Sequence, residues 1–89
     1  MNKIVIFTLN GCGHCEDLKN HLKEIEIDFV ELEINEHNEV WYEVVSQTGY
    51  DLLPSIFISN EENDDGPIFV PERDFKSRDE CVNIIKQYI

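Results

Sequence analysis

Two cysteines separated by two residues follow an apolar, β-branched run, and this arrangement constrains the fold more than any other feature. Residues 3–8 predict a buried strand, and Asn10-Gly11 predicts the turn that ends it. From Cys12 onward the apolar side chains recur at steps of three and four, which predicts one face of a helix: Cys15, Leu18, Leu22 and Ile25. The cysteine pair therefore lies where a strand leads into the start of a helix.

Two further segments carry regular patterns. Within residues 27–34, Val30, Leu32 and Ile34 alternate with Glu31 and Glu33, which predicts a strand with one face in water. Residues 40–48 carry an apolar helical stripe, and Gly49 stands where a left-handed C-terminal cap is expected.

The last third of the chain predicts a hairpin and a helix. Residues 55–59 and 68–70 predict two antiparallel strands, with a turn at Asp65-Gly66. Ser77 and Glu80 form a capping box ahead of an apolar helical stripe. The predicted order is β-α-β-α-β-β-α, an α/β fold in which three helices flank a four-stranded mixed sheet. With 89 residues, we expect one domain over 1–89.

Charge and the N-terminal residues exclude some classes of partner. The formal net charge of −12 should repel phosphate backbones and anionic membranes, so we expect no nucleic-acid partner. The apolar run after Met1 is too short for a signal peptide or a membrane span. We therefore expect a cytoplasmic protein without membrane contact, and a monomer.

The segment Cys12-Gly13-His14-Cys15 predicts a redox-active dithiol. Cys12 should face the unpaired N–H groups at the helix start, which favours its thiolate and makes it the candidate nucleophile. Cys15 lies on the apolar stripe and suits the resolving role. His14 can carry partial positive charge, which should stabilise the Cys12 thiolate and raise the reduction potential.

The surrounding residues disfavour two other uses of the cysteines. A structural zinc site would need two more ligands beyond the pair, and only Cys81 and three histidines are available. A c-type haem site would need histidine where Glu16 stands. We therefore predict no metal site, and we interpret Cys81 as a core residue of the last helix.

The Cys-Gly-His-Cys segment after the first strand, together with Pro54 at the start of the third, resembles the glutaredoxin family of the thioredoxin superfamily. The likeness is to small, divergent, phage-like dithiol members and spans essentially the whole chain. It implies a thioredoxin-like fold, glutathione as co-substrate, no tightly bound cofactor, and a cis peptide bond between Leu53 and Pro54. In that conformation the Leu53 backbone would be free to bind a substrate.

The chain departs from the family pattern in three segments. Leu9 replaces a lysine ahead of the nucleophile, Leu52-Leu53 replaces Thr-Val, and residues 70–75 replace a Gly-Gly pair that cradles a glutathione carboxylate. Arg73 and Ser77, near the start of the last helix, are candidate substitutes for those glutathione contacts. Arg73, Lys76 and Arg78 form a basic cluster here, for which a solvated charged face is the alternative interpretation.

The resemblance favours a thiol-disulfide oxidoreductase that reduces protein disulfides, such as that of ribonucleotide reductase, or glutathione mixed disulfides. The electron donor would be glutathione or a thioredoxin-type reductase. A carrier that binds an iron-sulfur cluster through Cys12 and glutathione is the alternative, which the second thiol of Cys15 disfavours. The acidic segment 60–65 is interpreted as a solvated connection that can contact a partner.

Overall fold

The computed structural model describes residues 2–60 and 66–89. Its seven elements follow the predicted order. They are β1 (Asn2–Thr8), α1 (Gly13–Glu24), β2 (Val30–Glu33), α2 (Asn38–Thr48), β3 (Ser55–Asn60), β4 (Ile68–Phe69) and α3 (Arg78–Lys86). The fold is thioredoxin-like, and the prediction of a mixed sheet with three helices is confirmed.

The sheet has the strand order β2-β1-β3-β4, which places β1 in its interior. β1 pairs parallel with β2 and antiparallel with β3, and β3 pairs antiparallel with β4. The parallel pair requires a crossover, which α1 supplies. The chain therefore leaves β1 directly into the helix that carries the cysteines.

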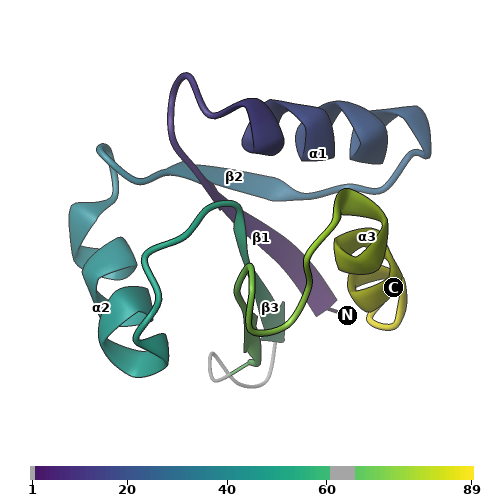
Figure 1. The fold of residues 1–89 in the computed structure, drawn as a ribbon. Helices are drawn as coiled ribbons and strands as arrows, with labels where there is room; N and C mark the ends of the chain where they lie inside the picture. Colours follow the sequence, from purple (N-terminus) through teal and green to yellow (C-terminus); the bar gives the residue numbers. More distant parts are fainter. Residues whose placement is uncertain (1, 61–65) are drawn as a thin grey trace.

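Both faces of β1 are buried, so the strand separates two apolar clusters. Ile4 and Ile6 point to the cluster that contains Leu22 of α1 and Ile85 of α3. Val5 and Phe7 point to the opposite face, where Phe7 packs against Trp41 of α2 with ring centroids 5.5 Å apart. Figure 1 accordingly shows α1 and α3 on one side of the sheet and α2 on the other.

The second strand differs from its prediction. It covers only Val30–Glu33, and its acidic side chains do not share one wet face, because Glu33 is buried whereas Glu31 is exposed. Val30 is 39% exposed, and β2 is an edge strand of the sheet. Alternation alone could not reveal that Glu33 accepts backbone hydrogen bonds.

The helix patterns hold with small differences. Cys15, Leu18 and Leu22 are buried as predicted, but Ile25 is exposed because α1 ends before it. Gly49 has φ of 76°, which confirms the left-handed cap of α2.

The start of α3 differs from its prediction in one contact. Ser77 caps the helix by accepting the N–H of Glu80 at 3.2 Å, as expected. The Glu80 carboxylate, however, accepts the N–H of Lys76 rather than that of Ser77.

Two predictions fall outside the described residues, namely the turn at Asp65-Gly66 and the character of the acidic segment 60–65 beyond Asn60. Gly66 itself is described, and a Cβ there would overlap the carbonyl oxygen of Ile58. Only glycine fits this approach to β3. None of the described helices is long and apolar enough to span a membrane.

The burial of Leu22 generates a stability prediction. Leu22 of α1 is fully buried against α3 and the sheet. Leu22→Ala should lower the free energy of unfolding by about 2 to 5 kcal/mol, through lost burial and the cavity left behind. The control Tyr42→Ala removes the side chain of a residue that is 76% exposed. It should change the free energy of unfolding by less than about 0.5 kcal/mol. Equal effects in urea denaturation would contradict this assignment of the core.

Candidate functional site

A tight turn carries the chain from β1 to the first cysteine. The N–H of Cys12 donates to the carbonyl of Leu9 at 3.0 Å, and Gly11 between them has φ of 87°. Glycine adopts this left-handed conformation without the steric cost that a side chain would impose. The Asn10-Gly11 signal in the sequence is thus the turn that places Cys12 at the head of α1.

Cys12 is the N-cap residue of α1. Its sulfur accepts the backbone N–H of Cys15 at 3.2 Å, and its carbonyl accepts the N–H of Glu16 at 3.1 Å. The sulfur thus lies at the positive end of the helix dipole, where negative charge is stabilised. Cys12 is partly exposed and all three cysteines are free thiols. This combination gives an accessible sulfur in surroundings that favour its thiolate.

Cys15 is fully buried one turn further along α1. Burial raises the pKa of its thiol to about 12, and the hydrogen bond with Cys12 adds to the rise. Cys15 is therefore a neutral thiol near neutral pH, out of reach of large substrates. The structure brings the two predicted cysteines together and gives them different environments.

Glu33 holds the turn before Cys12 and was missed as a site residue. One carboxylate oxygen accepts the N–H of Asn10 at 3.1 Å and the other accepts the N–H of Asn35 at 2.6 Å. The end of β2 is thereby tied to the turn that precedes Cys12. In the sequence, Glu33 fits the same alternation as Glu31, so nothing marked it as a site residue.

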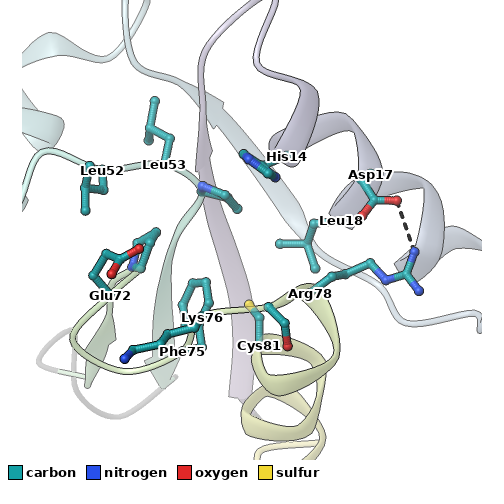
Figure 2. A pocket seen from close by; sticks show the side chains of 13 residues that line it. His14, Asp17, Leu18, Leu52, Leu53, Glu72, Phe75, Lys76, Arg78 and Cys81 are labelled. Atoms are coloured by element: carbon teal, nitrogen blue, oxygen red, sulfur yellow. Dashed lines mark hydrogen bonds and ion pairs between the residues drawn. The ribbon is translucent and has the colours of Figure 1, made fainter.

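A groove with a volume of about 360 Å³ lies beside the start of α1. His14 lines one side, Leu52, Leu53 and Pro54 line another, and the start of α3 closes the third, as Figure 2 shows for the labelled residues. The structure thus gathers three segments that are far apart in the sequence. Cys12 does not line the groove, but His14 places the CxxC segment at its edge.

The peptide bond between Leu53 and Pro54 is cis, as the resemblance implied. Within the part of the chain that the structure describes, the N–H and C=O of Leu53 make no hydrogen bond. These two groups can therefore pair with an extended substrate lying in the groove.

The start of α3 supplies the basic side of the groove. Ser77, Lys76 and Arg78 all line it. Arg78 is already paired, because its guanidinium contacts the Asp17 carboxylate of α1 at 3.0 Å, the dashed line in Figure 2. Lys76 makes no ion pair with any described residue, so its ammonium is available to an anion.

Arg73 does not belong to the groove. Its guanidinium contacts the Asp74 carboxylate at 2.9 Å and donates to the carbonyl of Ile68 at 2.7 Å. Asp74 in turn accepts the N–H of Val70 at 2.8 Å. Arg73 therefore stabilises the turn over residues 70–75, which stands where the sequence lacks Gly-Gly, instead of facing a ligand. Sequence spacing could not show which way the guanidinium points.

Cys81 closes the groove from α3, where only 1% of the residue is exposed. Burial raises the pKa of its thiol to about 12, so it is neutral near neutral pH. Its prediction as a core residue is confirmed. Among the described residues, no three His, Cys, Asp or Glu side chains form a group that could hold a metal ion.

The sequence comparisons point to one family. The chain matches the family profile described as Glutaredoxin over residues 4–62, a span that contains the CxxC segment and Pro54. No curated protein sequence matches the chain significantly.

Two solved structures share the fold. A buckwheat glutaredoxin in complex with glutathione superposes with a TM-score of 0.56 and 21% identity, covering 65% of this chain and 56% of that one. The holo form of glutaredoxin C1 from Populus tremula x tremuloides superposes with a TM-score of 0.59 and 20% identity. The match covers 94% of this chain and 74% of that one. The chain thus spans little more than half of the buckwheat protein.

The contacts of Glu33 predict a cost for its removal. Glu33→Ala leaves two partly buried backbone N–H groups without acceptors, which should lower the free energy of unfolding by about 1 to 3 kcal/mol. Glu33→Gln keeps one acceptor oxygen and should cost less. Glu43→Ala, which removes an exposed carboxylate of α2, is the control. If urea denaturation shows that Glu33→Ala and Glu43→Ala change the free energy of unfolding by the same amount, Glu33 does not hold the turn.

Proposed function

Because the chain belongs to the glutaredoxin family, we propose that it is a dithiol thiol-disulfide oxidoreductase in which Cys12 is the nucleophile and Cys15 the resolving thiol. One observation supports this most: the partly exposed Cys12 sulfur caps α1 and accepts the N–H of a fully buried second cysteine. The protein would act as a monomer of one domain in a reducing compartment such as the cytosol, where the dithiol is kept reduced.

The first step is attack by the Cys12 thiolate on a substrate disulfide. The new S–S bond joins Cys12 to one substrate sulfur, and the other substrate sulfur leaves as a thiolate that takes up a proton. The N–H of Cys15 and the helix dipole stabilise the attacking thiolate before the step. Partial exposure of Cys12 lets the substrate sulfur reach it.

The second step releases the reduced substrate. Cys15 loses its proton and attacks the Cys12 sulfur, so the Cys12–Cys15 disulfide forms, the bond to the substrate breaks, and the departing substrate thiolate takes up a proton. The two cysteines lose two electrons in total and the substrate disulfide gains them. Burial keeps Cys15 from reacting first, and its place within one helical turn of Cys12 makes the attack intramolecular.

Glutathione is the proposed co-substrate. The backbone of Leu53 can pair with an extended peptide, and the ammonium of Lys76 with the start of α3 can attract a carboxylate. Of the two glutathione contacts predicted from the sequence, Ser77 lines the groove and Arg73 does not. The buckwheat glutaredoxin was crystallised with glutathione, which supports the same ligand class here.

Protein disulfides are the wider proposed substrate class, with that of ribonucleotide reductase as one candidate. An extended segment around a substrate cysteine would pair with the Leu53 backbone as an added strand. A thioredoxin-type reductase is the alternative donor if glutathione does not serve. The iron-sulfur carrier has no specific support, because the adjacent Cys15 thiol allows an intramolecular disulfide in place of a cluster.

The proposed roles predict different losses for the two cysteines. In an assay of a small glutathione mixed disulfide with glutathione, glutathione reductase and NADPH, Cys12→Ser should lower the rate about a hundredfold or more, because no other accessible thiolate replaces it. Cys15→Ser should retain activity, since glutathione can resolve the mixed disulfide. Cys81→Ala, which removes the buried thiol that closes the groove, is the thiol control and should keep a rate far above that of Cys12→Ser. An active Cys12→Ser variant would rule out the assignment, whereas an inactive native chain would point to a different donor.

His14 is expected to raise the reduction potential of the Cys12–Cys15 pair. An imidazolium at position 14, two residues after Cys12, would stabilise the reduced form, so equilibration against glutathione should give a value near or above the glutaredoxin range of about −200 to −230 mV. His14→Ala should lower it by about 10 to 30 mV, and His21→Ala, further along α1, should leave it unchanged. A native value of about −270 mV or lower would contradict this role.

A further inference from the structure

The groove beside the start of α1 is lined by charges of both signs, and they are not equally available to a substrate. Its acidic lining residues are Asp17 and Glu72, and its basic ones are Lys76 and Arg78. Lys76 makes no ion pair with any described residue, whereas Arg78 is held by carboxylates. Of the two basic side chains at the groove, only that of Lys76 is therefore free to meet an anion.

Two carboxylates hold the Arg78 guanidinium. It contacts Asp17 of α1 at 3.0 Å and the neighbouring Asp79 at 3.4 Å. Figure 2 shows Arg78 extending toward Asp17 and away from Leu53, so the pair lies on the α1 side of the groove. One guanidinium and two carboxylates leave a net negative charge at this side, where a substrate in the groove would meet it.

The start of α3 is likewise occupied by acidic side chains of the protein itself. Asp79 and Glu80 lie in its first turn, where the helix dipole would otherwise favour a bound anion. The Glu80 carboxylate accepts the N–H of Lys76 at 3.0 Å. An anionic ligand such as glutathione is thus left with the Lys76 ammonium, and the remainder of this wall does not favour a second negative group.

We propose that Asp17 is a specificity-determining residue: by holding Arg78 it keeps this side of the groove net negative, and so selects neutral or basic protein disulfides over anionic ones. The inference rests on the proposed function, since it concerns the disulfide that Cys12 attacks. A basic residue beside the substrate cysteine is attracted by Asp17, whereas an acidic one is repelled. The formal net charge of −12 acts in the same direction over longer distances, where salt screens it.

Matched peptide disulfides measure this selection directly. The probes are disulfide-linked dimers of a blocked peptide whose central cysteine is flanked on both sides by lysine, glutamine or glutamate. Each dimer oxidises Cys12 and Cys15 to their disulfide and is itself reduced to two peptide thiols. Reduced protein is mixed with excess dimer and quenched with acid at intervals, and the remaining dithiol form is measured by mass after alkylation in denaturant.

The quantity to compare is a ratio of rate constants. The second-order rate constants for the lysine and glutamate peptides are each divided by that for the glutamine peptide, giving a lysine ratio and a glutamate ratio. A substitution that changes only the reactivity of Cys12 alters all three rate constants alike and leaves both ratios unchanged. The ratios therefore report charge selection separately from chemistry.

In the native chain the lysine peptide should react faster than the glutamate peptide. Asp17→Asn keeps the size of the side chain and removes its charge, so it should raise the glutamate ratio and lower the lysine ratio, each by about two- to fivefold at low salt. Arg78→Gln removes the opposite charge, so both ratios should move the other way. The side chains of Asp17 and Arg78 are 55% and 38% exposed, so both variants should fold.

The matched control is Glu24→Gln, which removes an exposed carboxylate at the other end of α1. It changes the net charge by the same amount as Asp17→Asn and should leave both ratios close to the native values. Equal shifts in the two variants would overturn the proposal, because net charge alone would then explain the selection. Ratios that Asp17→Asn leaves unchanged would overturn it as well. Failure of the proposed function gives a different result, in which the native chain is oxidised no faster than Cys12→Ser by any of the three peptides.

Discussion

The hydrogen bond from the Cys15 N–H to the Cys12 sulfur is the contact on which the rest of the site depends. It makes Cys12, the proposed nucleophile, the cap of α1, so its sulfur satisfies a backbone group that would otherwise lack a partner. This sulfur is thereby fixed at the helix start. Any change that moves the start of α1 would also move the redox centre.

The position of that helix start is set by two strands. β1 is buried on both faces and ends in the Leu9–Cys12 turn, and Glu33 ties this turn to the end of β2. Apolar burial fixes the strand, and hydrogen bonds to one carboxylate fix the turn. Stability and site geometry therefore rest on the same few elements. The groove beside them is shaped by the cis Leu53–Pro54 bond and the start of α3.

Burial has opposite consequences for the two thiols. Cys12 stays partly exposed at the start of α1, whereas Cys15 is shielded from solvent and harder to ionise. A network of fixed charges, in which Lys19 of α1 pairs with Glu16 and with Glu31 of β2, ties the helix to the sheet. Most of the surplus acidic charge remains outside this network, where it affects solubility more than chemistry.

The sequence by itself determined the order of elements, the Asn10-Gly11 turn, the Gly49 cap and the place of the cysteine pair, because each rests on local backbone preference or on apolar periodicity. Only the tertiary structure decided how polar side chains are used. Glu33 is buried rather than wet, Arg73 stabilises a turn rather than facing the groove, and Lys19 is enclosed by Glu16 and Glu31. A long polar side chain can reach several partners, and which one it meets depends on contacts between segments that are distant in the sequence.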